Sequence, residues 1–378
     1  MPRRRKLVLV SLAAALALAL GWGIYLLVLA GELSRLAYHS DAECTRVEGV
    51  VGAEDLAFTR ASGTPEGGVF VSSDDRRATV AGTPVRGAIY YYSLAPTAPG
   101  VAAIEVASGD DPELFHPHGI GVTPASAERE RLFVVNHPRA SLFGPNDHSE
   151  GPGHTIEVFD VISEAGRVRL DLQHTIADPL LVSPNDVAPV DAERFYVTND
   201  HLATSKLGHK LEDYGRLARG HVLYWDGDAF SVVADGILFA NGIDVSRDGT
   251  TVYVASVTGA RVHVFDRDPS SGALTAREQV PVRGPDNINI SDDGSLWIGA
   301  HPKLLTFTSY ANDAAKRSPS QVFRLSQTES GAWETEDVWL SDGSDISGLS
   351  VALGVGEGRF LVGSVFDAWL LDCQRVVD

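Results

Sequence analysis

The sequence predicts an all-β fold, a six-bladed β-propeller with an N-terminal transmembrane helix. Three observations indicate this fold class. A loose unit recurs six times after Gly52, turn-forming pairs separate short β-rich segments, and an uncharged apolar run opens the chain. Repeats of this length, each with room for four short strands, are typical of propeller blades and not of helical repeats.

The six units share an opening in which two polar residues precede an apolar–x–apolar strand. The openings lie at residues 54–58, 118–122, 185–189, 241–245, 286–290 and, least clearly, 347–351. They are spaced by roughly 45 to 67 residues, and a second β-rich strand follows each of them. The pairs Asp226-Gly227, Asp248-Gly249 and Asp293-Gly294 indicate tight hairpins. Helical periodicity after residue 40 is confined to about 210–219 and 310–316, where we expect helices inserted in loops.

The N-terminal segment has the pattern of a signal anchor. A basic cluster at residues 3–6 precedes an uncharged run from Leu7 to Ala30. At about 1.5 Å per residue, this run can span a hydrocarbon core of about 30 Å. The positive-inside rule then leaves the N-terminus cytoplasmic and the remainder outside the cytoplasm. A signal peptide that is cleaved from a secreted protein is the alternative.

We therefore expect three regions. Residues 1–30 form the basic cap and the membrane anchor, residues 31–43 form a linker, and residues 44–378 form the propeller domain that carries the activity. The chain has 31 Lys and Arg against 50 Asp and Glu, a net charge of −19. This acidic balance gives no basic surface for a nucleic-acid partner. It suits a site for a divalent cation.

The two cysteines flank the repeated units. Cys44 precedes the first unit and Cys373 follows the last. A propeller must join its first and last blades, and a disulfide between these residues would link the two chain ends covalently where the ring closes. A location outside the cytoplasm permits such a bond. The alternative is a pair of unrelated buried thiols.

The polar pairs that open the units are expected to converge. The innermost strand of every blade begins beside the central channel, so residues far apart in sequence become neighbours there. They contribute Glu54, Asp55, His118, Asn185, Asp186, Asn241, Asp286 and Asn287. Oxygen donors of this kind suit calcium rather than zinc. The set Glu54, Asn185, Asn241, Asp286 and Asn287 would supply two negative charges and three neutral oxygens. The alternative is that these residues only make turns at the starts of blades.

Three histidines are placed to face the channel. His118 occupies the channel-facing position of the second unit, and His137 follows the next strand of that unit. Two imidazoles beside a metal could form a dyad that abstracts a proton from water. His301 follows the corresponding strand of the fifth unit, where it lies at the channel mouth or caps the strand. The chain contains no G-x-S-x-G or H-E-x-x-H motif, so covalent serine catalysis and a zincin site are unsupported.

Seven short motifs, taken together and in order, resemble the paraoxonase/arylesterase family of calcium-dependent lactonases. They are GAEDL at 52–56, PHGI at 117–120, VVNHP at 134–138, NDV at 185–187 with RFYVTNDH at 194–201, FANGI at 239–243, DNI at 286–288 and HP at 301–302. The resemblance extends from about Glu43 to Cys373. It implies a six-bladed propeller with two Ca²⁺ ions in the channel, a disulfide between Cys44 and Cys373, and a retained hydrophobic N-terminus.

The resemblance also implies roles for individual residues. A catalytic calcium would be held by Glu54, Asn185, Asn241, Asp286 and Asn287, and a structural calcium by Asp55, Asp186 and the backbone carbonyl of Ile120. His118 and His137 would form the dyad, while His301 and Phe239 would line the substrate pocket. The charged segments 72–77 and 210–219 depart from the apolar character that the family would lead one to expect.

The expected function is calcium-dependent hydrolysis of lactones and aryl esters by a membrane-anchored enzyme. Calcium would polarise the carbonyl, and His118 assisted by His137 would activate water. One alternative is a metal-dependent propeller of the gluconolactonase or strictosidine-synthase-like kind, which should not need the histidine pair. Another is a non-enzymatic propeller outside the cytoplasm that binds a ligand, because a fold alone does not establish catalysis.

Overall fold

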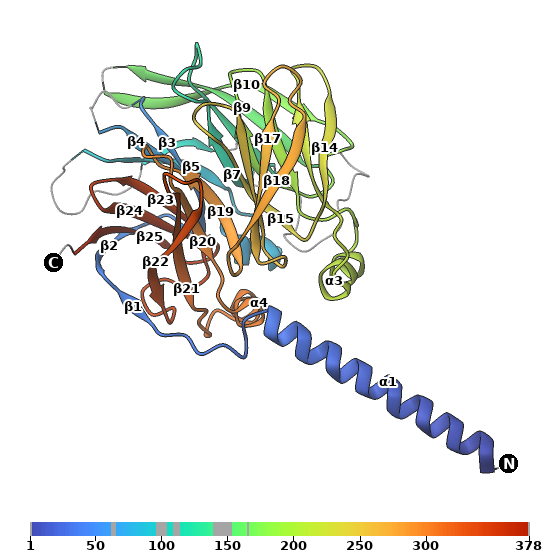
Figure 1. Cartoon of the computed structure of the whole chain (residues 1–378). Coiled ribbons are helices and arrows are strands. Elements are labelled where there is room, and N and C mark those ends of the chain that lie inside the picture. Colours follow the sequence, from blue (N-terminus) through green and yellow to red (C-terminus); the bar gives the residue numbers. More distant parts are fainter. Residues whose placement is uncertain are drawn as a thin grey trace.

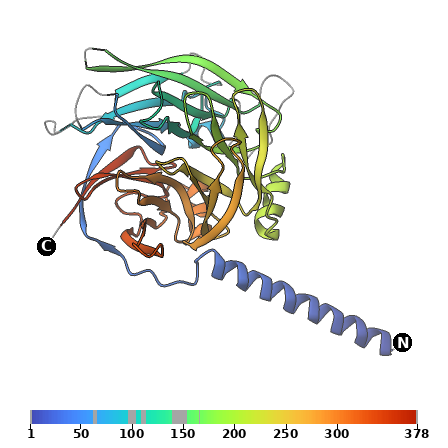
Figure 2. The ribbon, with the colours of Figure 1, turned by 45° about the horizontal axis from the view of Figure 1, so that its top comes forward.

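Six sheets are arranged around a central axis, which confirms the predicted six-bladed propeller (Figures 1 and 2). The structure, a computed structural model, describes residues 2–61, 66–95, 104–108, 114–138, 153–164 and 166–376. The innermost strand of each blade contacts that of the next, and β23 of the last blade contacts β3 of the first. The ring is therefore closed.

Each blade is an antiparallel sheet whose first strand lies innermost. The first blade contains β3 (Ala53–Thr59), β4 (Gly68–Ser73), β5 (Ala88–Ser93) and β6 (Ile104–Ser108). The second contains β7 (Pro117–Val122), β8 (Arg131–Asn136), β9 (Thr155–Glu164) and β10 (Arg167–Ala177). The third contains β11 (Pro184–Pro189), β12 (Phe195–Asn199), β13 (Gly220–Trp225) and β14 (Phe230–Ile237).

The remaining blades repeat this plan. The fourth contains β15 (Ala240–Val245), β16 (Thr251–Ser256), β17 (Arg261–Arg267) and β18 (Leu274–Pro281). The fifth contains β19 (Pro285–Ile290), β20 (Leu296–Ala300), β21 (Ser320–Gln327) and β22 (Trp333–Ser341), with β1 (His39–Ser40) added at its outer edge. The sixth contains β23 (Leu349–Gly356), β24 (Arg359–Ser364), β25 (Trp369–Arg375) and β2 (Ala42–Glu48).

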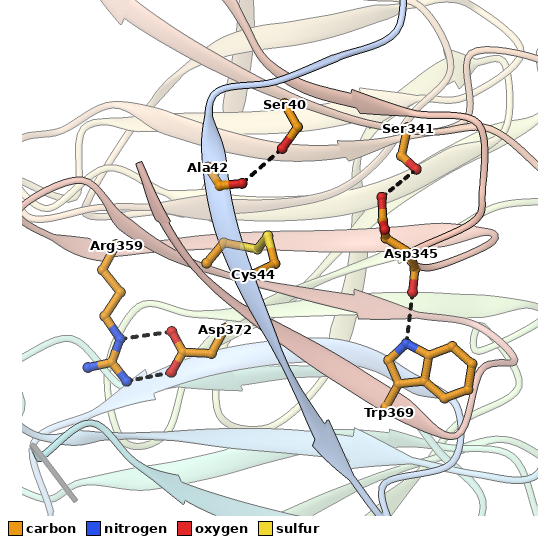
Figure 3. Close-up of a disulfide and its surroundings, with 9 residues drawn as sticks. Ser40, Ala42, Cys44, Ser341, Asp345, Arg359, Trp369 and Asp372 are labelled. Atoms are coloured by element: carbon orange, nitrogen blue, oxygen red, sulfur yellow. Dashed lines mark hydrogen bonds and ion pairs between the residues drawn. A yellow bond between two sulfur atoms is a disulfide. The ribbon is translucent and has the colours of Figure 1, made fainter. Parts of the chain in front are cut away.

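The sixth blade is built from both ends of the chain. Strand β2 pairs with β25, and Cys44 lies directly opposite Cys373 in that register. The two residues form a disulfide across a sequence separation of 329 (Figure 3). This confirms the predicted pairing. The bond lies within one blade, since the N-terminal strand completes the blade begun by the C-terminal ones.

The packing between blades holds the innermost strands in place. Between the second and third blades, Phe133 and Val135 of β8 pack with Phe195 and Val197 of β12, and all four are at most 1% exposed. Aromatic and β-branched residues of this kind favour pleated, buried strands. Similar apolar clusters lie between the other blades. The frame around the channel is therefore dry and closely packed.

A bulge at the start of each innermost strand presents the polar pair to the channel. In β3 the register shifts between Ala53 and Leu56, and β7, β11, β15 and β19 carry the same irregularity at their polar residues. A bulge adds an unpaired residue and redirects side chains. Gly119 allows close approach, because a Cβ there would lie 2.5 Å from the Asn185 carbonyl oxygen.

Three short helices lie in loops at the end of the propeller from which the N-terminal helix departs (Figure 1). They are α2 (Arg76–Val80), α3 (Lys206–Gly215) and α4 (Leu304–Asn312). Both expected helices exist, but each begins and ends earlier than its periodicity suggested. Ser205 caps the start of α3, and Arg216, with φ 51°, ends it in the left-handed conformation. The five-residue α2 was not predicted, because it is too short for a periodic pattern.

The N-terminal helix α1 (Pro2–Leu29) projects away from the propeller (Figure 1). Its segment Lys6–Leu29 has a mean hydropathy of 2.3, is not buried, and is long enough to cross a membrane. This pattern fits a signal anchor and a signal peptide equally. Near its end, Trp22 Nε1 donates to the Tyr214 carbonyl of α3 at 3.0 Å. The following segment, 31–43, holds β1 and the start of β2.

Candidate active site

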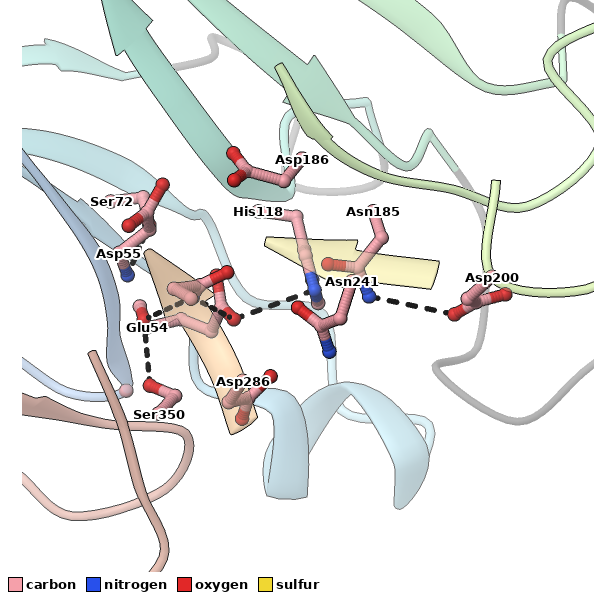
Figure 4. Close-up of polar contacts among 12 residues, drawn as sticks. Glu54, Asp55, Ser72, His118, Asn185, Asp186, Asp200, Asn241, Asp286 and Ser350 are labelled. Atoms are coloured by element: carbon pink, nitrogen blue, oxygen red, sulfur yellow. Dashed lines mark hydrogen bonds and ion pairs between the residues drawn. The ribbon is translucent and has the colours of Figure 1, made fainter. Parts of the chain in front are cut away.

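Polar side chains from five blades meet at one end of the channel (Figure 4). Asn287 Nδ2 donates to Glu54 Oε1 at 2.9 Å and to the Glu54 carbonyl at 3.1 Å, although these residues are 233 positions apart. His118 Nε2 lies 3.6 Å from Glu54 Oε1. Asn185 Nδ2 lies 3.5 Å from Asp200 Oδ2. The first and fifth blades are thus joined directly, and the side chains of the others face the same space.

Four oxygens of this cluster are buried and have no hydrogen-bond partner within the described parts of the chain. They are Glu54 Oε2, Asn185 Oδ1, Asn241 Oδ1 and Asn287 Oδ1. A buried acceptor without a partner costs about 1–3 kcal/mol, so four together are the donor set expected of a cation site. Carboxylate and amide oxygens are what Ca²⁺ accepts. The residues present therefore fit a calcium ion.

The amides are essential to such a site. Among the described residues, no group of three or more His, Cys, Asp or Glu side chains is placed to hold a metal ion. A cation here needs Asn oxygens in addition to the carboxylates of Glu54 and Asp286. Zinc, which favours nitrogen and sulfur ligands, is poorly matched to that donor set.

The carboxyl groups in the channel are held where negative charge is unfavourable. Burial raises the pKa of Glu54, partly offset by the nearby Arg76 guanidinium. Burial also raises the pKa of Asp286, and the adjacent His301 opposes this shift. A dication among these groups would favour their charged forms again. Their electrostatics are thus consistent with the fit inferred from the unpartnered oxygens.

Asp55 and Asp186 form a second group deeper in the channel. Asp55 Oδ2 accepts from the Ile120 N–H at 2.7 Å, and Asp186 Oδ2 accepts from the Ile243 N–H at 2.8 Å. Each carboxylate thereby joins its blade to the next. Burial and mutual repulsion raise the pKa of Asp55, and burial raises that of Asp186. Asp55, Ile120 and Asp186 line a cavity of about 480 Å³.

His118 and His137 are neighbours that have separate hydrogen-bond partners. Their ring centroids lie 5.0 Å apart, edge to face. His118 Nδ1 lies 3.4 Å from Arg76 Nη2, whereas His137 Nδ1 lies 2.7 Å from His154 Nδ1. Burial and the Arg76 charge lower the pKa of His118 to about 3, and burial together with His154 lowers that of His137. Both rings are therefore neutral at physiological pH.

The two residues expected in the substrate pocket lie on different sides of the cluster. His301 Nε2 lies 2.7 Å from Asp286 Oδ2, and its ring stacks on Phe307 of α4 at 3.8 Å. Phe239 has φ 51° and packs edge-on against His201, with ring centroids 4.9 Å apart. His301 thus contacts a predicted metal ligand, while Phe239 contacts the side chain that holds Asp200.

A small cavity of about 60 Å³ opens beside His118 and His137. It is also lined by residues that the sequence did not single out, namely Asp74, Arg76, His116, His154 and Asp200. The charged segment 72–77 and the motif at 194–201, which contains Asp200, gave a signal for some of them, but neither indicated which residue faces inward. Their positions depend on α2 and on contacts between blades.

A closed six-bladed propeller with a cluster of oxygen donors and histidines at one end of its channel defines the class of protein, a propeller with a candidate active site on its axis. A family model described as Arylesterase matches residues 64–374. Mouse serum paraoxonase/arylesterase 1 is 32% identical over 329 residues, which cover 85% of this chain and 86% of that protein. Human serum paraoxonase/lactonase 3 is 32% identical over 282 residues, which cover 74% and 75%. The chain belongs to the arylesterase family.

Solved structures with the same fold are more distant in sequence. A luciferin-regenerating enzyme has a TM-score of 0.50 and 12% identity, and the match covers 88% of this chain and 95% of that one. A gluconolactonase from Xanthomonas campestris has a TM-score of 0.50 and 16% identity, covering 89% and 91%. These likenesses concern the propeller fold alone.

Proposed function

We propose that this protein is a calcium-dependent hydrolase of lactones and aryl esters. The observation that carries the proposal is the set of four buried, unpartnered oxygens beside His118. Membership of the arylesterase family and the names of the paraoxonase relatives support hydrolysis of this bond type. Glu54, Asn185, Asn241, Asp286 and Asn287 would hold the catalytic calcium.

The residues around the cluster would have separate roles in hydrolysis. A bound calcium ion would polarise the substrate carbonyl and stabilise negative charge on its oxygen. His118 would accept a proton from the attacking water, because its Nε2 lies 3.6 Å from Glu54 Oε1 and so faces the cluster. His137, 5.0 Å away and bonded to His154, would assist by passing the proton outward.

Hydrolysis of a small panel of aliphatic lactones and phenyl acetate tests this proposal. We expect turnover with calcium and its loss after chelation. Replacing Glu54 by Gln should reduce kcat/KM by about 100-fold or more, since one ligand charge disappears and the amide keeps the shape. The matched control is Glu48→Gln, because Glu48 is exposed on β2. Full activity of Glu54→Gln would contradict the proposal.

Two other outcomes would favour the alternative functions. Undiminished turnover by the double variant His118→Gln/His137→Gln would indicate a metal-dependent propeller of the gluconolactonase or strictosidine-synthase-like kind. Calcium-dependent stability without hydrolysis of any lactone or ester would indicate a propeller that binds a ligand and uses calcium only for its structure.

A second calcium, with a structural role, would lie with Asp55, Asp186 and the backbone carbonyl of Ile120. The raised pKa values of the two carboxyl groups support a cation between them. Calcium titration by calorimetry should give two binding events, and Asp186→Asn should remove one and lower the unfolding temperature. A single event in the unmodified protein would contradict this assignment.

We further propose that residues 1–30 anchor the protein in a membrane, with the N-terminus cytoplasmic and the propeller outside the cytoplasm. The exposed apolar segment Lys6–Leu29 supports this placement. Residues 31–43 would connect the anchor to the catalytic domain formed by residues 44–378. Protease protection and N-terminal sequencing of membrane and secreted fractions test it. A secreted form that lacks α1 would indicate signal cleavage instead.

A further inference from the structure

Arg76 is a buried cation without a carboxylate partner in the described chain. Its side chain is 2% exposed, and Nη1 and Nη2 donate to the Gly52 and Pro117 carbonyls, both at 3.2 Å. It forms no ion pair within 4.0 Å among the described residues. Buried charges in proteins are normally paired, because removing them from water is costly. An uncompensated guanidinium in a pocket indicates an anionic ligand.

The two acidic residues that share the cavity are already engaged. Asp74 Oδ1 lies 3.0 Å from His116 Nδ1, and Asp200 Oδ1 lies 2.8 Å from His201 Nδ1. Burial alone would raise the pKa of Asp200, but the neighbouring His201 outweighs this effect and the pKa is lowered. Neither carboxylate forms an ion pair with Arg76, and Glu54 interacts with the Arg76 charge only from beyond the 4.0 Å of an ion pair. The guanidinium is therefore without a direct carboxylate contact in the described chain.

Arg76 also lies next to the proposed reaction centre. Its Nη2 is 3.4 Å from His118 Nδ1, and Nε2 of the same ring is 3.6 Å from Glu54 Oε1. The guanidinium is thus separated from the oxygen cluster by one imidazole. The pale blue helix in Figure 4 is α2, which begins with Arg76 and lies against the cluster. One substrate molecule can therefore place an anionic group at Arg76 and its scissile carbonyl at the oxygen cluster.

We propose that Arg76 determines substrate specificity by binding a carboxylate, so that the preferred substrates are lactones or esters carrying a carboxylate near the scissile bond. This inference rests on the proposed hydrolase function. In the reaction, water adds to the carbonyl carbon, the ring C–O bond breaks, and the leaving oxygen takes a proton to give a hydroxy acid. The carboxylate held by Arg76 is unchanged.

A matched pair of substrates tests the inference with the calcium-loaded full chain. The pair is 5-oxotetrahydrofuran-2-carboxylate and its neutral carboxamide, which share the lactone ring and differ in the charge of the substituent on the carbon that bears the leaving oxygen. We expect kcat/KM for the carboxylate to exceed that for the carboxamide by about tenfold or more, as one charge-assisted contact allows. In Arg76→Gln the ratio should fall towards one. Both absolute rates should fall as well, because Arg76 contacts His118.

Arg77→Gln is the matched control. Arg77 donates to the Tyr310 and Ala311 carbonyls, both at 2.9 Å, and does not line the cavity. This variant should keep the ratio of the unmodified protein. A ratio near one in the unmodified protein, or equal losses with both substrates in Arg76→Gln, would overturn the inference, since Arg76 would then be a structural counter-charge only.

Binding of tetrahydrofuran-2-carboxylate, which has no lactone carbonyl, separates this inference from the proposed function. Calorimetry should detect binding to the unmodified protein and its loss in Arg76→Gln. Binding without any lactone hydrolysis would keep the anion site and reject the hydrolase function. Hydrolysis of neutral lactones by a protein that does not bind tetrahydrofuran-2-carboxylate would keep the hydrolase function and reject the anion site. If Arg76→Gln does not fold, the carboxylate-to-carboxamide ratio of the unmodified protein decides the matter.

Discussion

At the scale of single residues, His201 shows how a charge outside the cluster positions a side chain within it. Its ring lies between Asp200 and Asp213, with nitrogen–oxygen distances of 2.8 and 3.1 Å. Asp200 in turn faces the amide nitrogen of Asn185, which leaves the amide oxygen free. The orientation of a predicted calcium ligand therefore depends on a histidine that does not reach the metal position.

The protonation of His201 predicts a pH dependence of stability. Burial alone would lower its pKa, but Asp200 and Asp213 outweigh this and raise it to about 10. An unfolded histidine has a pKa of about 6.5. The stabilisation of the folded state by the charged His201 ring is therefore fully present below pH 6.5 and is lost as the pH rises through 10. Between pH 7 and 10 the free energy of unfolding of the unmodified protein should fall by an amount on the order of a few kcal/mol. The variant His201→Gln should not show this fall.

Urea unfolding at pH 7, 8.5 and 10 with saturating calcium measures this difference. His174→Gln is the control, because His174 is exposed on β10. Parallel pH profiles for the unmodified protein and His201→Gln would show that the ring is not held as an imidazolium.

At the scale of elements, a residue of the linker 31–43 caps α4, a helix beside the candidate active site. Glu32 Oε1 accepts from the Leu305 and Thr306 N–H groups at 2.9 and 3.0 Å, at the start of α4. The N-cap residue of α4, Lys303, supplies no side-chain bond of its own. A carboxylate at a helix N-terminus satisfies free N–H groups and complements the helix dipole. Since Phe307 of α4 stacks on His301, this cap supports the site.

Replacing Glu32 by Ala should destabilise the protein by about 1 kcal/mol, the usual effect of losing a cap. We expect a lower unfolding temperature and a higher KM, because α4 and the His301 ring lose support. Glu48→Ala, at an exposed position of β2, controls for removal of a surface charge. A Glu32→Ala protein as stable and active as the control would show that α4 holds its position unaided.

At the scale of the whole molecule, closure of the ring depends on a blade assembled from both chain ends. Strand β2 completes the sixth blade, and the disulfide between Cys44 and Cys373 makes that closure covalent. The same blade is joined to the first by the Tyr92 hydroxyl, which donates to Asp372 Oδ2 at 2.7 Å. Opening the seam would separate the blades that carry Glu54 and Asn287.

Removing the disulfide should therefore weaken both folding and metal binding. The chain-entropy model gives a loss of about 6 kcal/mol for a loop of this length. We expect the unmodified protein under reducing conditions, and the double variant Cys44→Ala/Cys373→Ala, to unfold at lower urea concentration and to bind calcium more weakly. Reductant should not affect the double variant further. Equal stability of oxidised and reduced protein would show that β2 pairing alone closes the ring.

Much of the fold was predictable because its signals are local. Polar pairs ahead of apolar–x–apolar segments, turn pairs such as Asp248-Gly249 and one long apolar run lie in short stretches of sequence. The number of blades, the disulfide and the apolar helix were confirmed on that basis. The helix boundaries were less accurate, because caps such as Ser205 and the distant Glu32 set them.

By itself, the sequence determined which residue types open each blade. Because the openings of six closed blades meet at the axis, it also determined that oxygen donors gather there. Only the tertiary structure decided which oxygens remain without partners, since Asn287 bonds to Glu54 across the closed ring and leaves its own oxygen free. It also decided that Arg76 lines the small cavity without an ion pair in the described chain, whereas its neighbour Arg77 donates to the Tyr310 and Ala311 carbonyls. Pairing of side chains between blades is a long-range consequence of packing, and no local pattern encodes it.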